Sequence, residues 1–223
     1  IQVVGAWPWI PLTGGIKSSA GVPVVLRAAG DDIQVDNSVD YGSRRSPFAN
    51  KLLSASFPDV DLAIAISETV IAEYEAVGIP RERTVNIPPG VDLKAFDNEQ
   101  VDPAKVRQDF GLPVDLRLII SVGRNHPKKG FADLIRALPL LNVEGEKYAV
   151  VIVGKGTDEL VPLARELGVE RSFFPVDVVA EEPEPLGGTF PSRTLIQLYK
   201  SSDLFVYPSY VETYANVALE AMA

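Results

Sequence analysis

Cysteine is absent from the 223-residue chain, and histidine occurs once, at position 126. Without cysteine there is no disulfide scaffold, no thiol nucleophile and no cysteine-ligated zinc, and one histidine excludes a multi-histidine metal centre. Basic residues are also few: 21 lysines and arginines stand against 30 acidic residues, which gives a net charge of −9. That balance argues against a broad phosphate-binding surface, so we expect no nucleic-acid partner.

Long apolar runs are missing too. None approaches the roughly 20 residues that span a bilayer, and no signal peptide is visible, so the sequence indicates a cytoplasmic protein. Hydrophobic residues make up 46% of the chain and charged residues 23%, which is typical of a globular protein. The sequence begins in a strand-like run without methionine and stops inside an apparent helix at Ala223. We therefore expect a fragment that lacks both ends of its protein.

Short apolar runs rich in β-branched residues alternate with longer helical patterns. Strands are predicted at 23–27, 62–66, 84–87, 118–122, 149–153, 173–176 and 203–207, and helices at 46–57, 68–77, 130–141, 158–167, 192–200 and from about 213–216 onward. The helix at 130–141 is predicted from apolar residues spaced i, i+3, i+4, i+7 from Phe131. Such alternation predicts an α/β fold with parallel sheets and crossover helices.

Two segments interrupt this alternation. Residues 97–115 are polar and contain two prolines, which is typical of a linker between domains. Residues 180–191 are acidic and rich in proline and glycine, without periodicity. The second segment is predicted to be a surface excursion between a strand and a helix.

The run 122–130, VGRNHPKKG, places basic residues where a predicted strand ends. In open α/β sheets, ligands bind beyond the carboxyl ends of the strands. Arg124 and Lys129 at such an edge can neutralise a diphosphate, and an arginine can grip two oxygens at once. The alternative is a solvated basic loop that happens to follow a strand.

A second candidate lies at 208–222. Glu212 follows a predicted strand, and a helix begins near Asn216, where free N–H groups attract phosphate. Glu220 lies about one helical turn further on. Two carboxylates beside a phosphate site suit neutral hydroxyls, such as those of a sugar and a ribose. Alternatively, Glu212 only favours the helix N-terminus and Glu220 is an exposed helix residue.

Three weaker candidates complete the set. Gly154-Lys-Gly156 follows a strand but lacks the third glycine and the downstream acid of a dinucleotide fingerprint. Asp59-Val-Asp61 has the look of a metal motif, yet it begins a strand and so lies at the wrong end of the sheet. His126, beside two lysines, has the surroundings of a surface residue more than of a general base. We therefore expect no metal.

An ordered set of motifs resembles glycosyltransferase family 4. The matching runs are 64–67 (IAIS), 85–92 (VNIPPGVD) with Phe96, 106–107 with 110–113 (FGLP), 122–130, 153–156 (VGKG), 203–209 (DLFVYPS), and the pair Glu212 and Glu220 with seven residues between them. Each run is common by itself, whereas the ordered set is specific.

The resemblance implies a GT-B fold, in which two Rossmann-like domains with parallel sheets face a cleft, both incomplete in this chain. Residues 1–98 would be the carboxyl-terminal part of the acceptor-side domain and 99–223 the amino-terminal part of the donor domain. The implied activity is that of a hexosyltransferase-type enzyme. It moves a sugar from a nucleotide-diphosphate-sugar donor to a hydroxyl acceptor with retention of configuration, without a metal or a cofactor.

The same resemblance assigns roles to single residues. Glu212 would be catalytic at the reacting carbon, and Glu220 would bind the ribose. The donor diphosphate would be held by Arg124 and Lys129, next to Gly123, and by the backbone of Tyr214, Ala215 and Asn216. A glycan, lipid-linked or small-molecule hydroxyl would serve as the acceptor. The resemblance is also compatible with peripheral membrane association through amino-terminal residues that this chain lacks.

The chain departs from the family pattern in three places. Residues 27–32, RAAGDD, lack the His-Gly that often follows the matching strand, and Ala215 replaces a usual glycine. The 180–191 segment falls where the base-contacting loop is expected, so the donor base is not predicted. Two alternative functions therefore stay open: a sugar-nucleotide epimerase of GT-B architecture, and a non-catalytic nucleotide-sugar-binding module.

Overall fold

The computed structural model describes residues 1–143, 147–177 and 191–223, which fall into two units. The first unit comprises Ile1–Pro89 together with Val211–Tyr214, and the second comprises Gly90–Tyr210 together with Ala215–Ala223. The division after Pro89 comes earlier than the predicted one between residues 98 and 99. The predicted excursion at 180–191 lies outside the described residues except for its last one.

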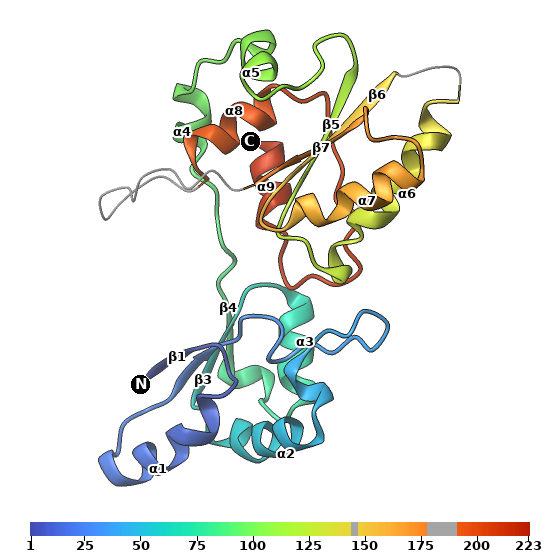
Figure 1. Ribbon diagram of the computed structural model, residues 1–223. Coiled ribbons are helices and arrows are strands. Elements are labelled where there is room, and N and C mark those ends of the chain that lie inside the picture. Colours follow the sequence, from blue (N-terminus) through green and yellow to red (C-terminus); the bar gives the residue numbers. More distant parts are fainter. Residues whose placement is uncertain (144–146, 178–190) are drawn as a thin grey trace. The chain divides into compact units, whose positions relative to one another are not determined.

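The first unit contains a four-stranded parallel sheet in the order β1-β2-β3-β4 (Figure 1). Its strands are β1 (Gln2–Val4), β2 (Val25–Arg27), β3 (Leu62–Ala65) and β4 (Thr84–Asn86), and its helices are α1 (Ile10–Ala20), α2 (Pro47–Ser56) and α3 (Glu68–Ala76), with short 3-10 turns at Ser43–Arg45, Phe57–Asp59 and Arg81–Arg83. The core of this unit includes the fully buried side chains of Leu26, Leu53, Phe57 and Tyr74.

Capping residues explain where two of these helices begin. The hydroxyl of Ser46 accepts the Ala49 N–H at 3.4 Å, and that of Ser67 accepts the Val70 N–H at 3.3 Å. Serine at this position satisfies an N–H group that has no partner within the helix. The predicted helices at 46–57 and 68–77 are therefore confirmed. Helix α1 was not predicted, because its Gly14-Gly15 pair lowers helix propensity.

The second unit contains a four-stranded parallel sheet in the order β7-β6-β5-β8. Its strands are β5 (Arg117–Val122), β6 (Tyr148–Val153), β7 (Phe173–Val176) and β8 (Leu204–Phe205), and its helices are α4 (Leu93–Asn98), α5 (Pro103–Asp109), α6 (Phe131–Leu141), α7 (Val161–Glu166), α8 (Arg193–Lys200) and α9 (Asn216–Met222), with 3-10 turns at Pro127–Lys129 and Thr157–Leu160. Strand β6, which follows β5 in the chain, lies on one side of β5, and β8 lies on the other side. This reversal of strand order marks where ligands bind in open α/β sheets.

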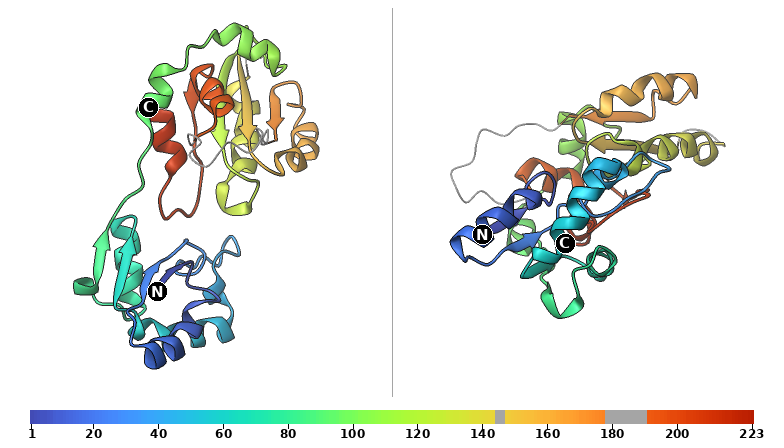
Figure 2. Two further views of the ribbon diagram at one scale, coloured as in Figure 1. Left: turned by 90° about the vertical axis from the view of Figure 1, so that its left-hand side faces the viewer. Right: turned by 90° about the horizontal axis from the view of Figure 1, so that it is seen from below.

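Side chains of alternate direction on β5 enter two different cores, as the pleat of a strand requires. Leu118 and Ile120 pack with α8 and α9, whereas Ile119 packs with α6 and α7. Figure 2 shows α8 and α9 on one side of the strands β5 to β7 and α7 on the other. Coverage on both faces explains why β5 and β6 are almost continuously apolar.

One carboxylate ties three elements of this unit together. Asp203, which precedes β8, accepts the backbone N–H of Leu118 at 2.8 Å and the guanidinium groups of Arg107 at 2.7 Å and Arg117 at 2.9 Å. Burial raises the pKa of Asp203, but these hydrogen bonds outweigh it and the pKa lies below its ordinary value. The start of β8 is thereby fixed to β5 and α5.

Three further elements differ from the predictions. The expected linker at 97–115 contains α5, which Asp102 caps by accepting the N–H groups of Ala104 and Lys105. The helix expected at 158–167 begins as a 3-10 turn, and its α-helical part starts at Val161, next to a proline that favours a first helical turn. The strand expected at 203–207 is shorter in the structure, where β8 covers Leu204–Phe205 and the N–H groups of Asp203 and Val206 on either side of it still donate to β5.

Candidate functional site

The carboxyl ends of β5 and β6 meet backbone to backbone. Gly123 follows β5, and Gly154 follows β6 with a φ of +152°. A Cβ atom at Gly154 would lie 2.0 Å from the Gly123 carbonyl oxygen, which is closer than real atoms approach. Glycine is therefore required at 154, and the two loops that follow the strands are in contact.

The segment 124–130, called the basic turn below, packs against the loop at 208–210. The Lys128 carbonyl accepts the Tyr210 N–H at 2.8 Å and the Ser209 hydroxyl at 3.0 Å. Gly130 ends the turn with a φ of +65°, and a Cβ atom there would lie 2.2 Å from the Pro208 carbonyl oxygen. Because no side chain fits between them, the turn and the 208–210 loop hold each other in place.

Lys129 is held by an aromatic side chain. Its ammonium donates to the Tyr207 hydroxyl at 2.6 Å and lies 5.0 Å from the centroid of that ring. The Tyr207 ring stacks on Phe205 with centroids 5.9 Å apart. The position of Lys129 is therefore set by Tyr207, two residues after β8, as well as by its own turn.

His126 lies in the basic turn, among its cations. Its Nδ1 accepts the Lys128 N–H at 3.2 Å, so the ring lies against the turn. Burial lowers the pKa of His126, and the charges of Lys128, Arg124 and Lys129 lower it further. Arg124 and Lys129, the two predicted diphosphate ligands, are thus both close enough to His126 to lower its pKa.

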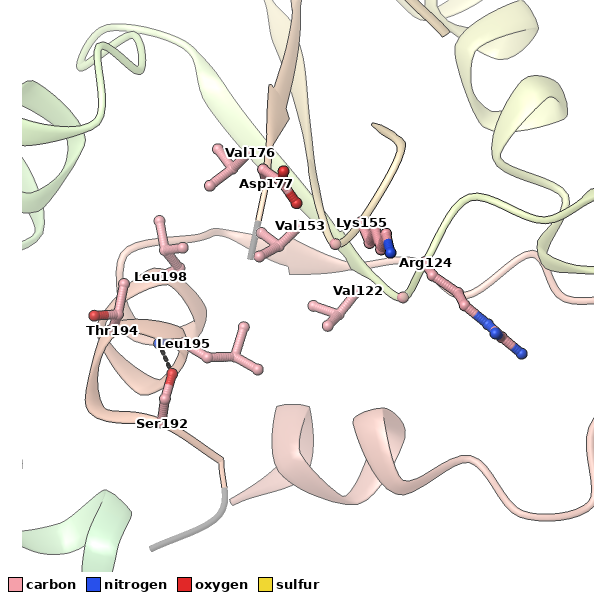
Figure 3. Close-up of a pocket in the computed structure, with 12 residues that line it drawn as sticks. Val122, Arg124, Val153, Lys155, Val176, Asp177, Ser192, Thr194, Leu195 and Leu198 are labelled. Atoms are coloured by element: carbon pink, nitrogen blue, oxygen red, sulfur yellow. Dashed lines mark hydrogen bonds between the residues drawn. The ribbon is translucent and has the colours of Figure 1, made fainter. Parts of the chain in front are cut away.

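Beside this turn, a cavity of about 190 Å³ opens at the carboxyl ends of β5, β6 and β7. It is lined by the apolar side chains of Val122, Val153, Val176, Leu195 and Leu198 and by the more polar residues Gly123, Arg124, Gly154, Lys155, Asp177, Ser192 and Thr194. In Figure 3, Val122, Val153 and Leu195 face one another across the hollow, and the Arg124 side chain extends away from them. The lining of this cavity is mainly apolar, and the charged residues Arg124, Lys155 and Asp177 also contribute to it.

Glu220 is buried, with 4% of its surface exposed, although it stands in the short helix α9. The Tyr199 hydroxyl donates to its Oε2 at 2.9 Å. Burial raises the pKa of Glu220, and the hydrogen bond from Tyr199 opposes that rise. The alternative prediction of an exposed helix residue is therefore wrong for Glu220.

Glu212 and Tyr214 belong to the first unit, whereas Ala215 and Asn216 belong to the second. The side-chain amide of Gln34 donates to the Glu212 carbonyl at 3.2 Å. Ala215 precedes α9 with a φ of −89°, a conformation that alanine adopts without strain. Replacement of the family's glycine at this position is therefore compatible with the local backbone.

Sequence reasoning missed a buried acid in the segment that lacks His-Gly. Asp32 is 2% exposed and accepts the backbone N–H groups of Ala29 at 3.0 Å, Gly30 at 2.9 Å and Ala6. Its carboxylate therefore orders the loops that follow β1 and β2. An acid two residues after a glycine is a signal for such a loop, because a short acidic side chain can accept nearby N–H groups.

Asp61, half of the Asp-x-Asp pair, has a structural partner. Its carboxylate accepts the Lys17 ammonium at 2.7 Å and the Val24 N–H at 2.7 Å, at the amino end of β3. Within residues 1–143, 147–177 and 191–223, no group of three His, Asp or Glu side chains is placed to hold a metal ion. The part of the chain that the structure describes also has no helix of the length and apolarity needed to cross a membrane.

Two parallel α/β sheets, one with a cavity at its strand ends, are the architecture of the GT-B fold. The fold of the chain matches the crystal structure of Anabaena Alr3699/HepE in complex with UDP-glucose with a TM-score of 0.71 at 21% identity, over 95% of this chain and 54% of that one. Residues 117–223 match the family model "Glycosyl transferases group 1".

Curated relatives agree with this assignment. A D-inositol 3-phosphate glycosyltransferase of Nocardia farcinica is 34% identical over 67% of this chain and 32% of its own length. A putative teichuronic acid biosynthesis glycosyltransferase of Bacillus subtilis is 26% identical over 93% of this chain and 46% of its own length. The chain belongs to the group 1 glycosyltransferases, and it spans about a third to a half of the length of these relatives.

Proposed function

We propose that the intact protein moves a sugar from a nucleoside-diphosphate-sugar donor to a hydroxyl acceptor, with retention of configuration and without a metal ion or a cofactor. The basic turn next to the apolar cavity carries this proposal. A nucleoside diphosphate has a flat base and a charged tail, and the cavity and the turn suit these two parts in that order. The crystal structure of HepE, whose fold this chain shares, is a complex with UDP-glucose, which supports a nucleotide-sugar donor.

Arg124 and Lys129 are the proposed ligands of the diphosphate. When the bond to the sugar breaks, negative charge develops on the leaving diphosphate, and fixed cations stabilise it. The Tyr207 contact holds Lys129 in place beforehand, so that little reorganisation is needed during the reaction. Side-chain cations acting this way make a divalent metal unnecessary in the proposed mechanism.

The carboxylates take the neutral hydroxyls. Glu220 is proposed to accept a ribose hydroxyl, and Glu212 to contact the transferred sugar near its reacting carbon. The backbone of Tyr214, Ala215 and Asn216 would complete the binding of phosphate. The sequence did not predict where the donor base binds. We propose that the base occupies the cavity formed by Val122, Val153 and their neighbours.

Substitution of Lys129 tests this assignment. In the intact protein, Lys129→Ala should lower kcat/KM about tenfold or more, because a charge-assisted contact contributes on the order of 1.4 kcal/mol or above. Lys105→Ala is the matched control: Lys105 is exposed on α5 and pairs with Asp109 at 2.7 Å, remote from the strand ends. Equal kcat/KM for the wild type and Lys129→Ala would contradict the proposed role.

Product analysis separates the alternatives. Transfer releases free nucleoside diphosphate and forms a glycosylated acceptor. An epimerase of the same architecture would yield an altered sugar, and a binding module would return the donor unchanged. Detection of glycosylated product with the anomeric configuration of the donor supports the proposal, and either of the other outcomes replaces it.

A further inference from the structure

Tyr199 joins α8 to α9 through its hydroxyl. The side chain is 9% exposed, and its ring packs near Phe96 and Phe205, with centroids 6.4 and 6.1 Å away. The hydroxyl lies 2.9 Å from Glu220 Oε2 and 3.3 Å from the Val217 carbonyl oxygen. The ring is therefore part of the core, while the hydroxyl faces the carboxyl group of α9.

A tyrosine hydroxyl has one proton to donate, and its two neighbours are both acceptors. Between a carboxylate and a carbonyl, the carboxylate forms the stronger hydrogen bond. Within the described part of the chain, Tyr199 is the residue that hydrogen-bonds the Glu220 side chain, and no described cation pairs with it. The bond engages Oε2, so Oε1 is left to accept a hydroxyl from a ligand.

We propose that Tyr199 is a positioning residue for donor binding: its hydroxyl fixes the Glu220 carboxylate so that Oε1 is presented to the donor ribose. This inference rests on the proposed function, because it takes the ribose as the partner of Glu220. A carboxylate on a flexible glutamate side chain otherwise loses rotamer freedom when a ligand binds. The bond from Tyr199 removes that loss in advance, which lowers the donor KM with little change in kcat.

The proposal also gives a pH readout. Burial raises the pKa of Glu220, and the hydrogen bond from Tyr199 lowers it. Burial and the neighbouring Glu220 raise the pKa of Tyr199, so that its hydroxyl stays protonated at neutral pH. Donor binding needs the ionised carboxylate, so it is present above the Glu220 pKa and is lost as pH falls through it. Removal of the hydroxyl raises that pKa further and moves the acid limb to higher pH.

The test is Tyr199→Phe in the intact protein, which keeps the ring and deletes the hydroxyl. We expect the donor KM to rise about threefold to tenfold, the range of one hydrogen bond, with kcat changed less than twofold. The acid limb of a plot of 1/KM against pH should shift upward. Tyr148→Phe, at the amino end of β6, is the matched control and should leave both unchanged.

A double mutant separates this inference from the proposed function. In a Glu220→Ala background, Tyr199→Phe should add no further increase in KM, because the tyrosine acts through the glutamate. Additive increases would overturn the positioning role. If Glu220→Ala leaves the donor KM unchanged, the ribose assignment itself is wrong. If Glu220→Ala raises KM and Tyr199→Phe does not, only the inference about Tyr199 fails.

A second substitution keeps the proposal testable if Tyr199→Phe does not fold. Incorporation of 3-fluorotyrosine at position 199 preserves the ring and the hydroxyl and makes the hydroxyl a stronger donor. The pKa of Glu220 should then fall, and the acid limb of donor binding should move to lower pH. An unchanged acid limb in this variant would contradict the proposed hydrogen bond.

Discussion

Gly130 and Gly168 allow two consequences of a glycine to be separated. Both have nearly the same left-handed backbone, with φ of +65° and +68°. A Cβ atom at Gly168 would meet nothing within 4 Å, whereas one at Gly130 would lie 2.2 Å from the Pro208 carbonyl oxygen. An alanine at either position carries the same left-handed strain, and only at Gly130 does it also collide with backbone.

The strain of a left-handed alanine costs roughly 1–2 kcal/mol. Gly168→Ala should therefore reduce the free energy of opening of the second unit by about that amount. Gly130→Ala adds an overpacking cost of about 1–3 kcal/mol, because the basic turn or the 208–210 loop must move. Lys129 moves with the turn, so kcat/KM should fall about tenfold or more in Gly130→Ala and stay unchanged in Gly168→Ala.

Amide hydrogen exchange at β5 and β6 measures the opening free energy of this unit by itself. Steady-state kinetics on the same samples supply kcat/KM. Equal losses of protection in the two variants, together with equal activity, would refute the view that the 208–210 loop fixes the basic turn. A loss of activity in Gly168→Ala would show that the control is not neutral.

The remaining predictions concern protons and metals. The pKa of His126 in the free protein should lie below its ordinary value near 6.5, because burial and the cations of the basic turn lower it. The stabilising contribution of neutral His126 is then complete above that ordinary value and is lost as pH falls toward the lowered pKa. A nucleoside diphosphate should raise the pKa of His126, because it neutralises the cations of the basic turn. NMR titration of the imidazole ring, with its signals assigned by comparison with His126→Gln, measures this change. A pKa that does not move on addition of the diphosphate would place the diphosphate elsewhere. Activity should also survive EDTA, and loss of activity that Mn²⁺ or Mg²⁺ restores would contradict metal-free transfer.

Much of the fold could be predicted from the pattern of apolar residues. The strand at 173–176 and the helix that Ser192 caps have the predicted positions, because periodicity and a capping serine are local signals. Helix α1 forms although it contains two glycines, because the burial of residues such as Ile10 outweighs the low helix propensity of glycine. The fold is therefore readable wherever local preference and burial agree.

The candidate site was predictable in part. Arg124 and Lys129 follow a strand end, and the rule for ligand sites in parallel sheets places both there. Burial of Glu220 was not predictable, because it depends on Tyr199 from a helix 21 residues earlier in the chain. The apolar cavity was missed for the same reason: its lining comes from the ends of three strands and from α8, which are brought together only by the fold.

The strand order of the second unit has a consequence for synthesis. Strand β5 is made before its two neighbours, and β8 is made only after β6 and β7, so that Asp203 reaches back across 85 residues to the Leu118 N–H. A chain emerging from the ribosome thus holds one edge of β5 open while β6, β7 and α8 are translated. An open apolar edge invites pairing with other chains. Arrival of Asp203 and β8 covers that edge of β5, so a pause in translation before residue 203 should favour aggregation of the nascent chain.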